Sequence, residues 1–306
     1  METLAPTQEP LLDRHGLAAP KSDYYADLTA RNNGLISPAD QARLRRSEIL
    51  VAGCGSIGGA VVAPLIRLGA ECLSWAEPDH YELHNLNRQQ AGLADIGRNK
   101  AEVLAEWAAG VNPRARVRVE TAGITAGNVR ELVSRAALIF DGVDVTAQPA
   151  LVCKYLLHEE AKRARVPVVS GYDIAGVQLV MVYDYRGRMP VLGGRIDAAG
   201  LAGRDPMRFL ARVVPLRALP LEIFPALRRL LIAPGAPFPQ LGYSAQMFGA
   251  LAPRLALDLL AGRPVRRRIL VDINNLPRTR RERSRVRVAR AVELARMAST
   301  ARSYRR

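Results

Sequence analysis

Cysteine is scarce in this sequence, with three residues, at positions 54, 72 and 153, in a chain of 306. They form no CxxC pair, so a zinc site of the usual cysteine type is excluded and no zinc is expected. Three thiols also cannot build a disulfide framework, which favours a reducing compartment, the cytoplasm. We expect all three cysteines to be small apolar residues of the core.

Long apolar runs are missing as well. No run reaches the ~18–20 residues that a membrane span needs, and the first residues, METLAPTQEPLLDRHG, contain no apolar stretch typical of a secretory signal. Hydrophobic residues make up 49% of the chain and charged residues 24%. This composition is that of an ordinary globular protein, long enough to bury a large core, and no membrane partner is expected.

Lysine is also rare, because only four of the 44 basic residues are Lys and the remainder are Arg. Residues 278–306 hold eleven Arg and two Glu, which is most of the formal net charge of +15. A basic tail can bind nucleic acid, but Tyr304 is its single aromatic residue for stacking on bases. We therefore expect a solvated terminal helix, and nucleic-acid binding is possible but not favoured.

Strand-like and helix-like segments alternate between residues 48 and 170. The apolar patterns predict strands at 48–53, 71–77, 115–120, 136–141 and 166–170, and helices at 57–68, 98–109, 128–135 and 149–165. A further strand at 177–185 follows without an intervening helix, so we expect it to run antiparallel. The predicted fold class is α/β, with a Rossmann-like, mostly parallel sheet that has helices on both faces and continues into antiparallel strands.

The chain divides into four predicted segments. Residues 1–46 form an N-terminal arm and a helix that begins at Ser37-Pro38, and residues 47–184 form the Rossmann-like core. Residues 185–277 contain an insert followed by a closing helix at 244–261 and a strand at 268–274. Eight of the twenty prolines lie in 186–243, and residues 278–306 are the basic tail.

A glycine-rich motif, Gly53-Cys-Gly-Ser-Ile-Gly58, lies between the first predicted strand and the first helix of this core. A turn of this kind places backbone N–H groups and a helix N-terminus where a phosphate can bind. Only glycine allows the tight turn at Gly53 and Gly55 and the close approach of a ligand. Glu77 ends the next strand, where a carboxylate can accept hydrogen bonds from a ribose.

The segment after Glu77 distinguishes between two kinds of nucleotide site. A dehydrogenase that binds NAD normally continues into a plain helix, whereas this chain has a polar cluster from Asp79 to Gln89. The cluster contains Arg88, and Lys100 lies in the first turn of the helix predicted at 98–109. Two cations beside a nucleotide neutralise a triphosphate and its pyrophosphate leaving group, a pairing that hydride transfer does not need.

Two carboxylates, Asp141 and Asp144, lie at the C-terminal end of the strand at 136–141. Ligands of open α/β sheets bind at the carboxyl ends of the strands. Aspartates three residues apart on such a turn can hold Mg²⁺ through oxygen and water ligands. A solvated turn is the alternative.

Taken in order, these motifs resemble the ThiF/MoeB/HesA family of ubiquitin-activating-like adenylyltransferases. The resemblance rests on GCGSIG, the strand-end Glu77, NLNRQ at 85–89, GRNKAEV around Lys100 and DGVD at 141–144, and it extends over roughly 31–275. Members that form a thioester use a cysteine later in the chain, and many add two CxxC pairs for zinc. This sequence has no cysteine after Cys153, so it resembles a divergent member.

The resemblance implies a homodimer that uses Mg·ATP to activate a carboxylate as an acyl-adenylate. It implies that the glycines cradle phosphate, that Glu77 binds the ribose, that Arg88 and Lys100 act on the triphosphate, and that Asp144 holds Mg²⁺. It also implies that Arg31, in the motif Ala-Arg-Asn-Asn, reaches the ATP of the other subunit. The expected cofactor-binding residues are Gly53, Gly55, Ser56, Gly58, Glu77, Asp79, Asn85, Arg88, Gln89 and Lys100.

The predicted function is therefore ATP-dependent adenylation of a carboxylate without an enzyme thioester. The acceptor would be the C-terminus of a small carrier protein or peptide, or a carboxylate on a small molecule or a tRNA. Two alternatives remain: a non-catalytic nucleotide-binding partner protein, which the lack of a late cysteine allows, and an NAD-dependent oxidoreductase of the Rossmann type.

Overall fold

The computed structural model describes residues 23–146, 148–194, 206–232 and 238–303. Its centre is a seven-stranded sheet with the strand order β3-β2-β1-β4-β5-β6-β7. The strands are β1 (Ile49–Ala52), β2 (Cys72–Ala76), β3 (Arg116–Glu120), β4 (Leu138–Asp141), β5 (Val168–Ile174), β6 (Val177–Tyr183) and β7 (Arg268–Asp272). The first five run parallel, while β6 and β7 are antiparallel to their neighbours. The predicted fold class is confirmed.

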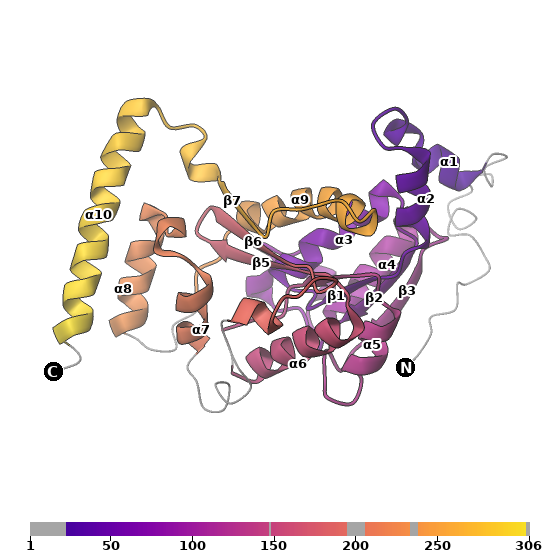
Figure 1. Cartoon of the computed structure of the whole chain (residues 1–306), viewed down its shortest axis with the longest axis horizontal. Helices are drawn as coiled ribbons and strands as arrows, with labels where there is room; N and C mark the ends of the chain where they lie inside the picture. The colour runs from indigo at the N-terminus through magenta and orange to yellow at the C-terminus, as the bar shows by residue number, and fades with distance from the viewer. Residues whose placement is uncertain (1–22, 147, 195–205, 233–237, 304–306) are drawn as a thin grey trace.

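Helices cover both faces of the sheet (Figure 1). On one face lie α3 (Ser56–Leu68), α4 (Lys100–Val111) and α9 (Gly242–Leu260), with the short α1 (Tyr24–Leu28) and α2 (Pro38–Arg46) at the N-terminal end. On the other face lie α5 (Val129–Arg135) and α6 (Gln148–Ala164). β1 and β4 are completely buried between these layers, which explains why their sequences are continuously apolar.

The ends of two helices show how local sequence sets the boundaries. Gly69 takes a left-handed conformation, with φ of 101°, and ends α3 as expected. The helix that follows, α4, was predicted at 98–109 with Gly110 as the residue that stops it, and both limits are wrong. Asn99 caps α4 by accepting hydrogen bonds from the N–H groups of Ala101 and Glu102, and the helix continues through Gly110 to Val111. An asparagine cap is a stronger signal than an arginine, and a glycine inside a helix costs only about 1 kcal/mol.

The proline-rich insert contains helices that the sequence pattern did not indicate. They are α7 (Pro206–Val213) and α8 (Phe224–Ile232), separated by the 3₁₀ turns η7 (Leu216–Ala218) and η8 (Leu221–Ile223). Phe209, Val213 and Phe224 are buried in the core that lies under α5 and α6. The insert therefore extends that core beyond the sheet instead of lying on the surface as a loop.

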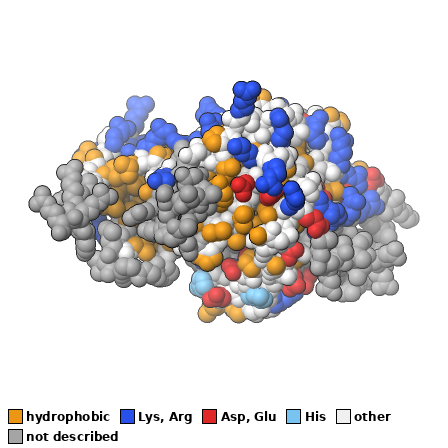
Figure 2. Space-filling model, turned by 60° about the horizontal axis from the view of Figure 1, so that its bottom comes forward, with side chains coloured by type: hydrophobic (Ala, Val, Ile, Leu, Met, Phe, Trp, Pro, Cys, Tyr) orange, Lys and Arg blue, Asp and Glu red, His pale blue; other side chains and the backbone are white. Residues whose placement is uncertain are grey.

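The basic tail forms α10 (Arg280–Ser303), which lies beside α8 (Figure 1). The expected terminal helix is present, but it is not fully solvated. Leu294 and Met297 pack against the core of the insert, and Glu293 forms an ion pair with Arg228. Basic side chains also spread along the upper part of the face in Figure 2, so positive charge is not confined to α10. Within the described residues, no helix is long and apolar enough to cross a membrane.

Candidate active site

A cavity of about 980 Å³ opens at the carboxyl ends of β1, β2, β4 and β5. It lies where the strand order changes direction between β1 and β4, which is the usual ligand site of an open α/β sheet. Most of the predicted site residues line it: Gly53, Gly55, Ser56, Glu77, Asp79, Asn85, Arg88, Gln89, Lys100 and Asp144. Gly58 and Arg31 do not line it.

The glycine loop is shaped by close backbone contacts. Gly53 has φ of +81°, and a Cβ atom there would lie 2.6 Å from the carbonyl oxygen of Gly142. A Cβ on Gly58 would lie 1.8 Å from the carbonyl oxygen of Gly53. Gly58 therefore allows α3 to pack tightly on the loop, which is a structural role. Gly55 is the N-cap of α3 and has no side chain that could accept a hydrogen bond from the helix. The first N–H groups of this 13-residue helix are therefore available to an anion.

Glu77 joins the glycine loop to the segment that follows β2. Its Oε2 accepts a hydrogen bond from the Cys54 N–H at 2.5 Å, and its Oε1 accepts one from the Asp79 N–H at 2.9 Å. Burial raises the pKa of this carboxyl group, while the two backbone N–H groups and Lys100 oppose the rise. A carboxylate has about four lone-pair sites, so Glu77 can hold the loop and still accept hydroxyl groups of a ribose.

The polar cluster after Glu77 is folded back over the loop by its own amide side chains. Asn99 donates from Nδ2 to the carbonyl of Glu77 at 2.9 Å, so the start of α4 lies directly against the end of β2. Asn85 is buried, and its Oδ1 accepts the Glu82 N–H at 3.0 Å. Lys100 is only 6% exposed, and its Nζ lies 3.2 Å from Asp79 Oδ2. The sequence analysis did not single out Asn99, although its position before a helix is a recognisable capping signal.

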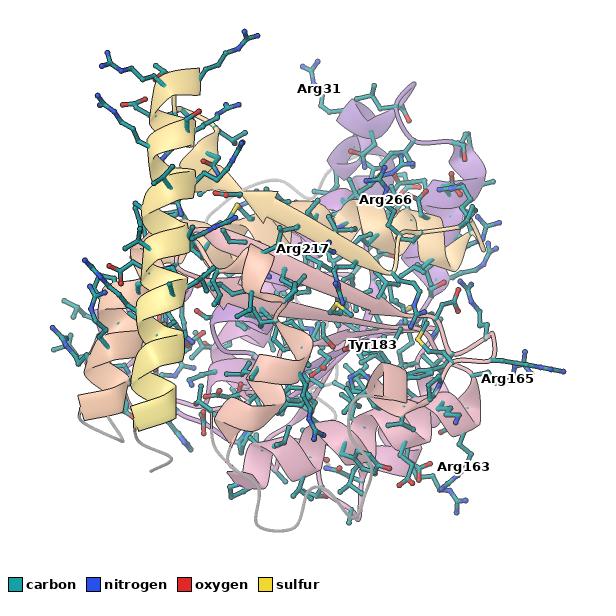
Figure 3. All side chains as sticks on the ribbon, turned by 60° about the vertical axis from the view of Figure 1, so that its left-hand side comes forward. Arg31, Arg163, Arg165, Tyr183, Arg217 and Arg266 are labelled. Carbon is teal, nitrogen blue, oxygen red and sulfur yellow. The ribbon has the colours of Figure 1, made fainter. Side chains whose placement is uncertain are left out.

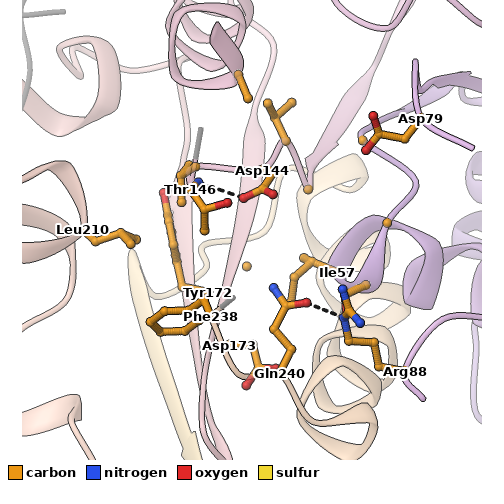
Figure 4. A pocket seen from close by; sticks show the side chains of 18 of the residues that line it. Ile57, Asp79, Arg88, Asp144, Thr146, Tyr172, Asp173, Leu210, Phe238 and Gln240 are labelled. Carbon is orange, nitrogen blue, oxygen red and sulfur yellow. Dashed lines mark hydrogen bonds between the residues drawn. The ribbon is translucent and has the colours of Figure 1, made fainter. Parts of the chain in front are cut away.

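Arg88 lines the same cavity and lies beside Gln240 (Figure 4). Its Nε donates to Gln240 Oε1, and its Nη1 donates to the carbonyl of His84 at 2.9 Å. Burial lowers the pKa of this guanidinium group, and the charges of Asp144 and Asp173 oppose the fall. Arg88 and Lys100 thus line one cavity, as the sequence predicted, and Gln240 connects Arg88 to the end of the insert.

Within the part of the chain that the structure describes, Ser56 Oγ and Gln89 Oε1 at this end of the cavity are buried and have no hydrogen-bond partner. Buried polar groups in proteins are nearly always paired, and these two oxygens can pair with a ligand in the cavity. Both side chains belong to the predicted nucleotide site and line the cavity. Together with the open helix N-terminus and the two cations, they form a polar end that fits a nucleoside triphosphate.

The two aspartates at the carboxyl end of β4 have different roles, which corrects the idea of a paired magnesium site. Asp144 is exposed at the cavity, and its Oδ1 accepts the Thr146 N–H at 2.8 Å (Figure 4). Asp141 is completely buried and turned away from the cavity into the protein. Mg²⁺ in nucleotide sites is commonly held by one or two carboxylates, with phosphates and waters as the other ligands. Asp144 fits that arrangement, whereas Asp141 does not take part.

Asp141 belongs to a buried polar cluster that the sequence analysis missed. Its Oδ2 is the partner of Lys154 Nζ, of His158 Nε2 at 2.9 Å and of Ser170 Oγ at 2.6 Å. Burial alone raises the pKa of Asp141, but Lys154 and His158 outweigh that effect and hold the pKa below its usual range. Burial lowers the pKa of His158. Lys154 and His158 are spaced i, i+4 on α6, a pattern that would have placed them on one helix face.

Asp173, near the end of β5, is a second residue that the sequence analysis missed. Asp173 lines the cavity together with its sequence neighbours Tyr172 and Ile174, and burial raises the pKa of Asp173 to about 6. The hydroxyl of Ser244, the backbone of Leu241 and the charge of Arg88 oppose that rise. A carboxyl group with a shifted pKa in a cavity is a candidate functional group.

The raised pKa of Asp173 has a consequence for stability. We expect Asp173→Asn to increase the melting temperature relative to the native chain at pH 7.5 and to have a smaller effect at pH 5. The unfolded chain binds the proton with a pKa near 3.8 and the folded chain with a pKa of about 6. The native chain therefore loses stability as the pH rises from about 4 to 6, and the Asn variant avoids that loss. Thermal unfolding across this range measures the difference, and a difference that does not change with pH would contradict the shifted pKa.

The cysteines occupy three different environments. Cys54 is completely buried in the glycine loop, and burial raises its pKa well above the ordinary value. Cys72 is partly exposed on β2. Cys153 is partly buried and lines the cavity, so the expectation of a core position is only half correct. Burial raises the pKa of Cys153 too, which keeps the thiol protonated and makes it a poor nucleophile.

Arg31 lies outside the site. It is exposed on the 3₁₀ turn η2 (Ala30–Asn32), and its side chain points away from the protein (Figure 3). The turn is tied to the end of α3 by Asn32, whose Nδ2 donates to the carbonyl of Leu68 at 3.1 Å. Arg31 therefore cannot contact a nucleotide in its own cavity.

Comparison with known protein families gives one match that covers most of the chain. The model of the ThiF family matches residues 29–290. This range contains all the residues predicted for the site.

Curated proteins of related sequence cover the chain only in part. The probable adenylyltransferase/sulfurtransferase MoeZ of Mycobacterium tuberculosis (strain ATCC 25618 / H37Rv) is 32% identical over 132 residues, which is 43% of this chain and 32% of MoeZ. The SAMP-activating enzyme E1 of Haloferax volcanii is 30% identical over 152 residues, 49% of this chain and 54% of that enzyme. The chain thus spans about a quarter to a half of the curated relatives that it matches.

Solved structures share the fold over a larger part of the chain. The tRNA N6-threonylcarbamoyladenosine dehydratase TcdA of E. coli has a TM-score of 0.55 with 20% identity, over 79% of this chain and 97% of that chain. MccB of E. coli, solved with ATP, has a TM-score of 0.56 with 17% identity, over 77% of this chain and 63% of that chain. At this level of identity the similarity shows the fold.

Proposed function

The chain belongs to the ThiF family, and we propose that it is an adenylyltransferase that uses ATP to activate a carboxylate as an acyl-adenylate. The observation that carries the proposal is the polar end of the cavity, where the glycine loop, two cations and two unpaired buried polar atoms meet. Relatives with this chemistry in their names support it, among them the sulfur carrier protein ThiS adenylyltransferase of Bacillus subtilis, 25% identical over 171 residues. More specifically, we propose that the carboxylate is activated in the way that ubiquitin-like modifiers are activated.

The residues of the polar end have separate roles in this proposal. The N–H groups that follow Gly55 bind phosphate oxygens, and Glu77 accepts the ribose hydroxyls. Ser56 and Gln89 pair their unsatisfied oxygens with hydroxyl or amino groups of the nucleotide. Asn85 holds the backbone at Glu82, and Asp79 holds Lys100 in position beside the triphosphate.

Adenylation requires little acid–base chemistry from the protein. The acceptor carboxylate is already ionised, so its oxygen attacks the α-phosphorus directly while the bond from that phosphorus to the pyrophosphate oxygen breaks. Arg88 and Lys100 stabilise the negative charge that accumulates on the departing pyrophosphate. The remaining contribution is to hold the two reactants in line. A Mg²⁺ ion held by Asp144 would neutralise further phosphate charge there.

We propose that no thioester forms on the enzyme. Cys54 is completely buried, and burial raises the pKa of Cys54 and Cys153, so neither thiol is a good nucleophile. An amine, sulfide or thiolate from a partner, or a group within the acceptor itself, would then consume the adenylate. The three free cysteines also support a reducing compartment, the cytoplasm.

We further propose that the protein acts as a homodimer. The outward position of Arg31 is suited to reaching the nucleotide of a second subunit. The acceptor would be a carboxylate-bearing small protein, peptide or small molecule, and a nucleic-acid acceptor is not favoured.

Nucleotide choice separates this function from that of an NAD-dependent oxidoreductase. We expect Mg·ATP to bind at least tenfold more tightly than NAD, because Arg88 and Lys100 complement a triphosphate. Isothermal calorimetry with each nucleotide measures the ratio, and a titration of ATP without Mg²⁺ reports the contribution of the metal. Tight binding of NAD without binding of ATP would contradict the proposal.

A further inference from the structure

The cavity has a second end that the nucleotide does not need. It is lined by the insert and by α10 with apolar side chains, among them Leu210, Val214, Leu219, Ile223, Phe238 and Met297. Among the described lining residues of 206–240 and α10, none is charged. Figure 4 shows Leu210, Tyr172 and Phe238 gathered on one side of the cavity and Asp79 and Arg88 on the other.

The sequence of α7 explains how this wall is formed. Phe209 and Val213 are spaced i, i+4 and are buried in the core of the insert. Leu210, one position after Phe209, and Val214, directly after the last residue of α7, are only partly buried and line the cavity. α7 therefore has an apolar face wider than its contact with the core requires. The extra leucine and valine are exposed to the cavity.

The two ends of the cavity meet at a short polar boundary. Gln240, at the end of the insert, accepts a hydrogen bond from Arg88, and Asp173 lies close enough for its charge to affect that arginine. In the proposed function the acceptor carboxylate attacks the α-phosphorus from the side opposite the departing pyrophosphate, and this boundary is where the apolar end of the cavity gives access to the nucleotide. The group that carries the carboxylate then extends into the apolar end.

We propose that the acceptor is a carboxylic acid carried by an apolar group, such as an acyl chain of medium length, which binds in the apolar end. This inference rests on the proposed function for the position of the carboxylate. Burying apolar surface is favourable, whereas buried amide or charged groups need partners. Among the described residues of the insert and α10 that line the cavity, Gln240 alone has a polar side chain, and Tyr172 and Asp173 lie toward the boundary with the nucleotide end. The total volume of about 980 Å³ is at the upper limit of single-ligand sites, in agreement with two ligands in one cavity.

The test is the binding of three acids by calorimetry in the presence of Mg²⁺ and a non-hydrolysable ATP analogue. Octanoate, octanedioate and acetate share the carboxylate and differ in the apolar group or in its far end. We expect octanoate to bind at least tenfold more tightly than either of the other acids. Equal binding of octanoate and octanedioate, or no binding of octanoate, would overturn the proposal.

Substitutions in the apolar wall provide the matched comparison. Leu210→Asn should weaken octanoate at least tenfold and leave the affinity for the ATP analogue unchanged. Leu216→Asp is a second variant for the case that α7 does not tolerate the first, because Leu216 lines the cavity but is 66% exposed. Leu276→Asn is the control, since Leu276 is exposed and lies outside the cavity. If octanoate binds these wall variants and the control equally, the apolar end is not its site.

The nucleotide titration keeps this inference distinct from the proposed function. Failure of the ATP analogue to bind the native chain would contradict the adenylyltransferase. Binding of the analogue together with weak, unselective binding of the three acids would contradict the apolar acceptor alone.

Discussion

Lys100→Ala is expected to lower acceptor-dependent ATP–pyrophosphate exchange by about 10²-fold or more, and Arg88→Ala should have an effect of the same order. Lys100 is almost completely buried, with Asp79 as its partner at the edge of the cavity. A charge held in a site of low dielectric stabilises a developing charge far more strongly than a solvated one does. Loss of the ammonium group should therefore slow the chemical step itself.

Exposed cations provide the controls for these variants. Lys162→Ala and Arg266→Ala remove one charge each from exposed positions outside the cavity and should leave exchange within a factor of about two. Circular dichroism and the melting temperature establish that each variant is folded. Exchange at the native rate in a folded Lys100→Ala protein would contradict the role proposed for Lys100. No exchange in the native protein would support the alternative of a nucleotide-binding partner without catalysis.

The parts of the site that could be predicted from the sequence are those determined by local backbone chemistry. Gly53 needs a positive φ and Gly58 needs room for a neighbouring carbonyl oxygen, so a motif of fixed spacing identifies both. Glu77 follows a buried strand, and this alone places it at the sheet edge. These features depend on residues close together in the chain.

The parts that could not be predicted depend on contacts between distant segments. Arg88 meets Gln240, which is 152 residues away, and Asp173 lies in the site only because β5 is next to β4. The apolar end of the cavity combines α7, Phe238 and Met297, none of which forms a motif. Periodicity also could not show that Asp141 is turned inward, because the position of its side chain is determined by Lys154 and His158 on a helix packed against β4.

Asp141→Asn is expected to reduce the free energy of unfolding by about 3–5 kcal/mol at pH 7, because it leaves the buried Lys154 without a counter-charge. The pKa of Asp141 is held below its usual range, so its contribution is fully present above the unfolded pKa of about 3.9 and is lost only as the pH falls further. Urea unfolding at pH 7 measures the loss. Arg254→Met, which removes an exposed partner of Asp258 and leaves Arg263 as its other partner, is the control and should cost at most about 1 kcal/mol.

A second substitution tests whether the pair itself is the cause. Adding Lys154→Met to Asp141→Asn removes the unpaired charge, so the double variant should be more stable than the Asp141→Asn variant. Substitution of Asp141 also affects the nucleotide end. Asp141 Oδ1 accepts the Val143 N–H at 3.1 Å and thus holds the turn that carries Asp144. Asn keeps an acceptor at that position, so the affinity for Mg·ATP should fall much less in Asp141→Asn than in Asp141→Leu. If the double variant loses as much free energy of unfolding as Asp141→Asn and Lys154→Met lose together, the whole cluster, and not the charge pair, provides the stability.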